Sequence, residues 1–233
     1  MNPFQNFDAS LLEKTGLNRL AVFDIDALPD DVAALVRASC LSGPYRQLIL
    51  IGNAGRQLWQ SVQESGFEAS DPIDAFSVRT MQGWFAHCAP HNRYEIIYPG
   101  EAPIGLQRLG QLAGWHHASP FMVGVDPKWG SWFAYRALAL ADTAFEPSKP
   151  QQSAHPCDSC ADRPCIAACP AGALAGGRFD LHKCITERKR AGSSCKNTCL
   201  ARISCPVGEA HRYCDAQMQH IYSLSLQAIE RYY

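Results

Sequence analysis

Eight cysteines lie between residues 157 and 205, and this group constrains the chain more than any other feature of its sequence. The first four have the spacing C-x2-C-x4-C-x3-C, and the fourth and the eighth are each followed by proline. Thiolates hold a [4Fe–4S] cube four at a time, and in two-cluster ferredoxins the cysteine before proline binds the other cluster. The spacing therefore predicts two [4Fe–4S] clusters held close together.

If each cysteine that precedes a proline binds the cluster of the other run, an exchange of ligands between the runs, the sequence predicts which thiols share a cluster. The first cluster would be held by Cys157, Cys160, Cys165 and Cys205. The second would be held by Cys169, Cys184, Cys195 and Cys199. The spacing of the second run is irregular, so Cys184 and Cys195 are its least secure ligands, and Cys214 is the alternative.

Two other uses of cysteine compete with this interpretation. A disulfide framework belongs to oxidising compartments and to small chains without a core, whereas this chain has 233 residues, 47% of them hydrophobic. Its N-terminus has neither a basic region nor an apolar run, so we expect no signal peptide and a cytoplasmic location. Two zinc sites remain the alternative, because zinc also binds four thiolates, although such sites usually show two C-x2-C pairs.

The charge balance argues against large polyanionic partners. The net charge is −1, from 21 basic and 22 acidic residues, and no apolar run approaches the length of a membrane span. We therefore expect neither a membrane nor nucleic acid as a partner. One basic group lies beside the second cysteine run, and it could offset cluster charge, dock an acidic electron donor or attract a phosphate backbone. Its members are Lys183, Arg188, Lys189, Arg190 and Lys196.

A proline-rich segment, EPSKPQQSAHP, interrupts helical and strand periodicity near residue 146. It divides the chain into residues 1–145, expected to form an α+β domain, and residues 146–233, expected to form the cluster domain with a helix at 217–233. Strand-like runs are predicted at 20–25, 47–51, 94–98, 121–125 and 132–140. Helices are predicted at 8–16, 29–39, 55–65, 71–87 and 105–114.

Aromatic residues and glycines concentrate between residues 114 and 141, which is typical of a pocket for a flat cofactor. The candidate cofactor-binding residues are Trp115, His116, Trp129, Trp132, Tyr135 and Arg136. Candidate proton donors are His117 and Glu101. The alternative is a packed aromatic core, with the histidines satisfied by hydrogen bonds and Arg136 paired with a carboxylate.

The order of these motifs carries a resemblance. The GW step, the strand WGSWFAYRALALAD, a proline-rich link and then CxxC…CP resemble the core of epoxyqueuosine reductases. The same strand resembles cobalamin-processing proteins of the methylmalonic aciduria type C family, and the first cysteine run is similar to that of electron-transfer subunits of molybdenum oxidoreductases. The resemblance implies a nitroreductase-like α/β sandwich domain, as in reductive dehalogenases, followed by a small bacterial-type dicluster ferredoxin domain. It also implies that the chain handles cobalamin.

The chain departs from the epoxyqueuosine reductase pattern at two points. The acidic residue expected before an Ala-Pro step is either absent or shifted onto Glu101, and a GW-Ile-Gly-Lys-like turn is replaced by Gly114-Trp115-His116-His117. A tRNA epoxide is therefore not carried over as the substrate. The expected function is a reductase that passes electrons from two [4Fe–4S] clusters to a cobalamin-type cofactor or substrate, with ferredoxin or flavodoxin as donor and flavin as a lesser alternative. A dicluster electron carrier without catalysis and a cobalamin-handling chaperone remain alternatives.

Overall fold

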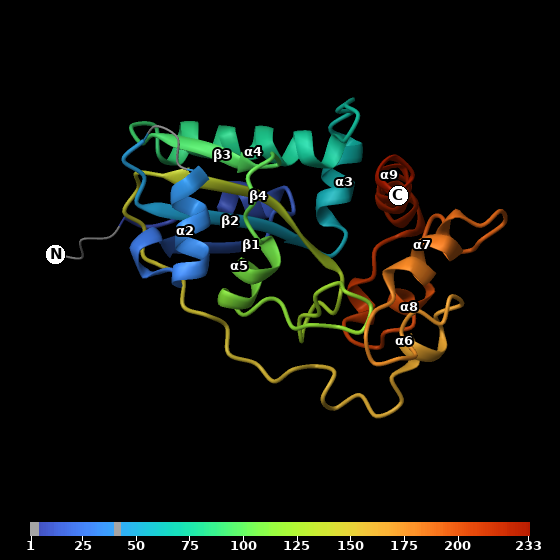
Figure 1. Ribbon diagram of the computed structural model, residues 1–233. Helices are drawn as coiled ribbons and strands as arrows, with labels where there is room; N and C mark the ends of the chain where they lie inside the picture. Colours follow the sequence, from blue (N-terminus) through green and yellow to red (C-terminus); the bar gives the residue numbers. More distant parts are fainter. Residues whose placement is uncertain (1–4, 40–42) are drawn as a thin grey trace. The chain divides into compact units, whose positions relative to one another are not determined.

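The computed structural model describes residues 5–39 and 43–233 (Figure 1). The chain forms two compact units. Unit 1 consists of residues 1–114 and 133–152, and unit 2 consists of residues 115–132 and 153–233. The chain therefore passes between the units three times, and the segment 115–132 belongs to the unit that contains the eight cysteines. That the units are a nitroreductase-like and a ferredoxin-like domain, divided after residue 145, stays a prediction.

Unit 1 is built on a four-stranded antiparallel sheet with the order β1-β2-β4-β3. The strands are β1 (Arg19–Asp24), β2 (Gln47–Ala54), β3 (Tyr94–Tyr98) and β4 (Phe133–Ala141). Every residue of β2 is buried, as expected for a central strand rich in Leu and Ile. The α+β class predicted from the sequence is therefore confirmed.

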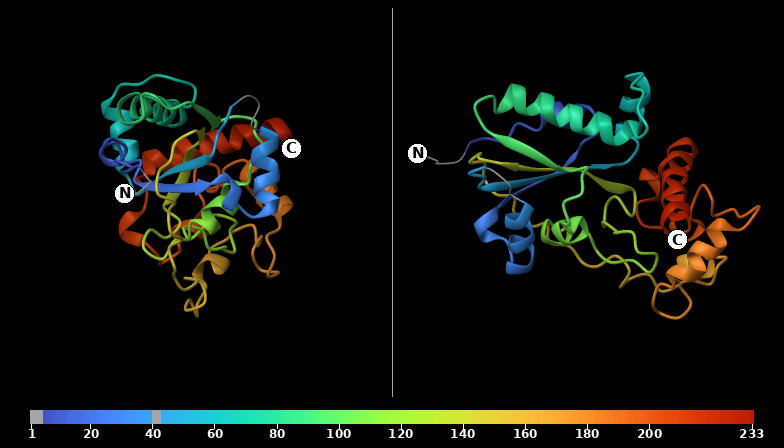
Figure 2. Two further views of the ribbon diagram at one scale, coloured as in Figure 1. Left: turned by 90° about the vertical axis from the view of Figure 1, so that its left-hand side faces the viewer. Right: turned by 45° about the horizontal axis from the view of Figure 1, so that its top comes forward.

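Helices cover both faces of this sheet. The long helix α4 lies along one face, and α2 and α5 lie on the other (Figure 2). Asp71 caps α4 by accepting a hydrogen bond from the Asp74 amide, and Pro72 follows at the first helical position. The helices of unit 1 are α1 (Ser10–Lys14), α2 (Asp30–Ser39), α3 (Gln57–Glu64), α4 (Pro72–Cys88) and α5 (Leu106–Leu112).

The proline-rich segment lies against unit 1 up to residue 152. Its Ser148 amide donates to the Val22 carbonyl at 2.8 Å, and the Val22 amide donates to Ser148 Oγ at 3.0 Å. The Gln151 amide donates to the Ala113 carbonyl at the end of α5. A segment that the sequence marks only as irregular is thus hydrogen-bonded to β1 at Val22 and to the end of α5 at Ala113.

Unit 2 consists of short helices and loops around small apolar clusters. Its helices are α6 (Pro164–Ala167), α7 (Leu181–Lys189), α8 (Leu200–Ile203) and α9 (Asp215–Tyr232). The C-terminal helix predicted from the sequence is confirmed as α9. Among the described residues, no helix is both long and apolar enough to cross a membrane, and the cytoplasmic location stays a prediction.

The strand predicted at residues 121–125 is wrong. This segment forms turns and bends, and Met122 has a left-handed φ of 65°, which a strand does not allow. Phe121 and Val125 are nevertheless buried, because they pack into the apolar cluster that contains Cys165 and Cys205. The hydrophobic pattern came from packing in a loop instead of from a sheet.

Candidate metal centres

Four cysteines line one cavity of unit 2, about 330 Å³ in volume, which we call the Cys157 cavity. Cys165 stands in the first turn of α6, and Cys205 follows α8. His155 also lines this cavity, and its Nδ1 accepts a hydrogen bond from the Cys157 amide at 3.1 Å. The four thiols of the cavity are those of Cys157, Cys160, Cys165 and Cys205.

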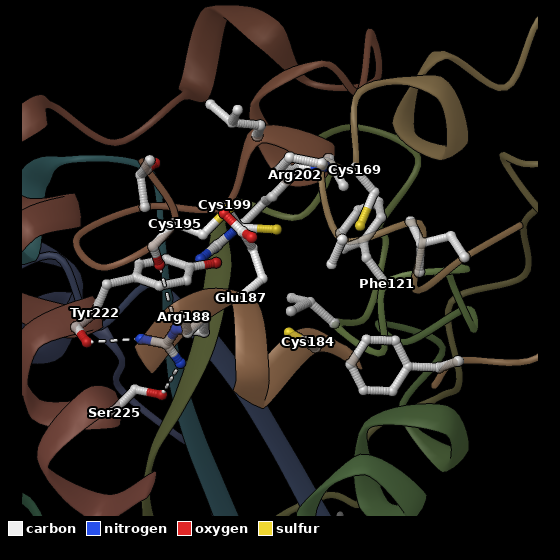
Figure 3. A pocket seen from close by; sticks show the side chains of 18 of the residues that line it. Phe121, Cys169, Cys184, Glu187, Arg188, Cys195, Cys199, Arg202, Tyr222 and Ser225 are labelled. Carbon is white, nitrogen blue, oxygen red and sulfur yellow. Dashed lines mark hydrogen bonds between the residues drawn. The ribbon is translucent and has the colours of Figure 1, made fainter. Parts of the chain in front are cut away.

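Four other cysteines line a second cavity of unit 2, about 310 Å³, which we call the Cys184 cavity (Figure 3). Cys184 is carried by α7, whose N-terminus is capped when Asp180 accepts the Lys183 amide. Cys199 is the residue that precedes α8. The four thiols of this cavity are those of Cys169, Cys184, Cys195 and Cys199. The structure therefore brings the cysteines together in the two sets that exchange of the Cys-Pro ligands predicts.

The two cavities share a wall. Phe121 and Leu174 line both of them, and both side chains belong to one apolar cluster of unit 2. Cys165 lies within α6 and Cys169 lies just after its end, and the two residues line different cavities. The two cavities are therefore adjacent, and that their cysteines hold two clusters stays a prediction.

Burial makes the free thiols weak acids. It raises the pKa of Cys184 to about 11, with the neighbouring Cys199 adding to the effect. It likewise raises the pKa of Cys157, Cys165 and Cys205. Only the thiolate binds metal, so occupation of these cavities must displace the thiol protons.

Other metal-binding arrangements are less well matched to these residues. Cys214, the alternative ligand, is the residue before α9 and lines neither cavity. Within residues 5–39 and 43–233, no three His, Cys, Asp or Glu are grouped around a position for one metal ion. The thiols instead surround volumes, and a [4Fe–4S] cube is a larger group than a zinc ion with four ligands at about 2.3 Å. The donor set and its arrangement therefore fit a cube in each cavity.

The predicted cofactor-binding residues are divided between the two units. Trp115, His116, Trp129 and Trp132 lie in unit 2, together with the cysteines. Trp132 is fully buried and Trp115 is 2% exposed. The Trp129 ring packs on the His211 ring with centroids 4.2 Å apart. These side chains are engaged in the packing of unit 2.

Tyr135 and Arg136 belong to β4 in unit 1, where the pairing with β2 is irregular, and their side chains contact different helices, α5 and α4. The Tyr135 hydroxyl lies against Gly110 of α5, where a Cβ atom would overlap it. Arg136 Nε donates to Asn53 Oδ1 at 2.7 Å, and its Nη1 lies 3.5 Å from Asp74 Oδ1. Tyr135 and Arg136 thus make contacts within unit 1, and the assignment of the six residues to one cofactor site stays a prediction.

The two predicted proton donors also lie in different units. His117 belongs to unit 2, where its Nε2 lies 2.9 Å from Ser153 Oγ and its ring lies near His155. Burial lowers the pKa of His117, and the nearby His155 ring lowers it further, so the His117 ring is mainly neutral at pH 7. Glu101 is exposed in the turn after β3 of unit 1. The two side chains are not gathered in one unit.

Sequence reasoning missed several residues of these cavities. The sequence predicts a strand at Phe121, and no sequence pattern points to Leu174 or Arg202 as residues of a metal site. The sequence groups Arg188 with four other basic residues of several possible roles. In the structure Arg188 is buried, whereas Lys183 of the same group is exposed. An arginine four residues after Cys184, on the same face of a helix as that ligand, was the available signal.

No protein-family model matches the chain, and no curated protein matches it. Solved structures of similar fold do exist. Epoxyqueuosine reductase from Bacillus subtilis is 14% identical with a TM-score of 0.56, and the match covers 88% of this chain and 66% of that one. An epoxyqueuosine reductase with an epoxyqueuosine-modified tRNA stem loop is 15% identical with a TM-score of 0.56, covering 90% and 67%. A reductive dehalogenase with B12-dependent dehalogenation is 11% identical with a TM-score of 0.51, covering 92% and 33%.

These likenesses show the fold. The predicted resemblance to epoxyqueuosine reductases is confirmed at that level. The chain spans about two thirds of the length of the reductases and a third of the length of the dehalogenase.

Proposed function

We propose that this chain is an iron–sulfur electron-transfer protein of the reductase type, with one [4Fe–4S] cluster in each of its two cavities. The observation that carries the proposal is the grouping of four cysteines around each cavity, with a wall shared between them. Bound clusters would supply one-electron transfer. The fold likeness to epoxyqueuosine reductases and a reductive dehalogenase, which are reductases, supports the same class of activity.

The residues of unit 2 would perform three tasks. Deprotonated thiols would hold the iron, four from each cavity. Phe121 and Leu174 would keep water out of the wall between the clusters. Arg188 and Arg202 would place positive charge beside an anionic group in the Cys184 cavity. Electrons would come from a low-potential donor of the ferredoxin or flavodoxin class, and the exposed members of the basic group, such as Lys183, could receive it.

The acceptor that we propose is a cobalamin-type cofactor or substrate. The fold likeness to a reductive dehalogenase with B12-dependent dehalogenation supports this acceptor. The predicted pocket residues do not, because Trp132, Tyr135 and Arg136 are engaged within their own units. We therefore derive no chemical step on cobalamin. Flavin remains the lesser alternative, and a carrier or a cobalamin-handling chaperone would share the same clusters.

A nucleic-acid substrate is the second candidate. One structure of similar fold contains a tRNA stem loop, which weighs against the expectation that nucleic acid is not a partner. Binding of a tRNA stem loop to the reconstituted protein, measured by fluorescence anisotropy at 50 and 200 mM salt, tests this candidate. Phosphate contacts would make the affinity fall steeply with salt.

The proposal is tested by anaerobic reconstitution with iron and sulfide, followed by iron analysis and EPR. We expect about eight irons per chain, as two [4Fe–4S] cubes require. The Cys165→Ser variant should lose about half of that iron, whereas Cys214→Ser, the matched control outside both cavities, should keep it. Retention of one tightly bound zinc per cavity without sulfide would overturn the proposal.

Titration of the reconstituted protein with cob(II)alamin then separates the functional classes. A shift of the cobalt EPR signal to a base-off form would support a reductase or chaperone, and consumption of a substrate would identify an enzyme. An unchanged cobalt signal with full iron content would leave an electron carrier.

A further inference from the structure

Two arginine side chains are buried in the wall of the Cys184 cavity (Figure 3). Arg188 on α7 is 7% exposed, and Arg202 on α8 is 5% exposed. Arginine is almost never fully buried unless its charge is paired. The charge partners of these two side chains therefore indicate what the cavity is built to hold.

The hydrogen bonds of Arg188 within the described part of the chain all end on neutral oxygens. Its Nη1 donates to Ser225 Oγ and its Nη2 to the Tyr222 carbonyl, each at 2.9 Å. The remaining bonds go to the carbonyls of Cys195, at 3.2 Å, and Lys196, at 3.4 Å. Arg188 therefore keeps its full positive charge, and it also fixes the backbone of the loop that carries Cys195.

Arg202 is held in a similar way. Its Nε donates to Ser131 Oγ at 3.3 Å, and its Nη2 donates to the Ser131 carbonyl. Its guanidinium lies 4.7 Å from the centroid of the Trp132 ring and 5.2 Å from that of the Tyr213 ring. Aromatic faces attract a cation without neutralising it.

No described carboxylate lies within ion-pair distance of either arginine. The acidic residue of the cavity wall is Glu187. It forms an ion pair with Arg190 at 2.7 Å and accepts a hydrogen bond from Ser193 Oγ at 2.9 Å. Burying an uncompensated charge is costly, and an anion in the cavity would offset that cost. A cube held by four thiolates is such an anion.

The Cys157 cavity differs in this respect. The charged residues that line it, apart from His155, are Asp158, Arg163 and Arg178, and all three are exposed. Water and salt screen exposed charges, whereas a charge in a buried wall acts at a lower effective dielectric constant. Arg212, which is half-buried, acts on Cys205 from outside the lining of the Cys157 cavity, but among the described residues only the Cys184 cavity of the two is lined by buried arginines, so their fields differ.

We propose that Arg188 and Arg202 hold the reduction potential of the cluster in the Cys184 cavity above that of the cluster in the Cys157 cavity. Reduction adds one electron and makes a cluster more negative, so buried cations stabilise its reduced form. One electron from a donor of the ferredoxin or flavodoxin class would therefore reside on the cluster in the Cys184 cavity, leaving its neighbour oxidised. No bond is formed and no proton moves. This inference rests on the proposed function.

The experiment is an EPR-monitored redox titration of the reconstituted full chain, with dithionite as reductant. The wild type should show two midpoint potentials. Arg202→Gln should lower the higher one by at least a tenfold change in the reduction equilibrium, which is 59 mV for a one-electron couple. Arg202→Lys, which keeps the charge, should lower it by less than half as much. Arg178→Gln, the exposed control in the other cavity, should change neither potential by that amount.

The wild-type titration decides the question even where Arg202→Gln fails to retain iron. Cys160→Ser alters or removes the cluster of the Cys157 cavity, so it should change the lower-potential signal. A change in the higher-potential signal, equal wild-type potentials, or an Arg202→Gln potential equal to wild type would each overturn the inference. Those results would leave the two clusters in place. A wild-type protein without [4Fe–4S] signals would instead overturn the proposed function and the inference with it.

Discussion

Substitution of Gly130 by alanine is a sharp test of how unit 2 is assembled. Gly130 and Gly208 both adopt left-handed φ angles, 61° and 67°, and their backbones lie in direct contact. A Cβ on Gly130 would overlap the carbonyl oxygen of Val207, two residues after Cys205. This contact joins the segment 115–132 to the end of the cysteine-rich region.

The expected cost has two parts. A left-handed backbone costs an alanine about 1–2 kcal/mol relative to glycine. Overlap with a backbone oxygen adds roughly 1–3 kcal/mol, as overpacking does elsewhere. The free energy of unfolding should therefore fall by about 2–5 kcal/mol. Gly177 is the matched control, because its φ is 72° but no heavy atom lies within 4 Å of a Cβ placed there. Gly177→Ala should show only the first part.

The assay is anaerobic urea denaturation of the reconstituted variants, monitored by cluster absorbance, which reports on unit 2, and by tryptophan fluorescence, which reports on both units. With an m-value of about 2 kcal/mol/M, the Gly130→Ala midpoint should fall by about 1–2.5 M and that of Gly177→Ala by about 0.5–1 M. Equal shifts for the two variants would refute the backbone contact between residues 130 and 207–208.

Three further predictions address other parts of the molecule. Burial raises the pKa of Asp74, and the negative charge of Asp71 raises it further, so this carboxylate binds a proton more tightly in the folded state than in the unfolded state. Stability should therefore fall as pH rises from the ordinary Asp value of 3.8 through the raised pKa, and Asp74→Asn should flatten this slope in urea titrations between pH 4 and 7. Trp132→Ala should lower the free energy of unfolding by about 3–5 kcal/mol, because that side chain is fully buried, and Trp132→Phe by less. Reconstitution at pH 7 should release protons from the thiols, since burial raises the pKa of Cys184 to about 11, in addition to those released when hydrosulfide becomes bridging sulfide; release no larger than the sulfide contribution would contradict the thiol assignment.

Much of unit 1 could be predicted from local sequence patterns. The runs at 47–51 and 94–98 became β2 and β3, and the periodic run at 71–87 became α4, because these segments have strong local signals and are stabilised where they stand. The run at 121–125 failed because its apolar residues pack among the cysteines of unit 2, and a hydrophobic pattern alone does not distinguish a strand from a buried loop. The residues of the predicted aromatic pocket adjoin in the chain but belong to different units, so that pocket stays a prediction.

The sequence by itself determined which cysteines are candidate ligands and which chemistry their spacing predicts. The spacing around Cys165 and Cys169, with proline after Cys169, predicts that neighbouring thiols serve different sites, and in the structure Cys169 lies beyond the end of α6 and lines a different cavity from Cys165. Only the tertiary structure decided the surroundings of those thiols. Burial of Arg188 and Arg202, and the wall that Phe121 provides, depend on contacts between segments far apart in the chain. Ligand identity is a local property, whereas the field and the solvent exclusion around a ligand are set by everything that packs against it.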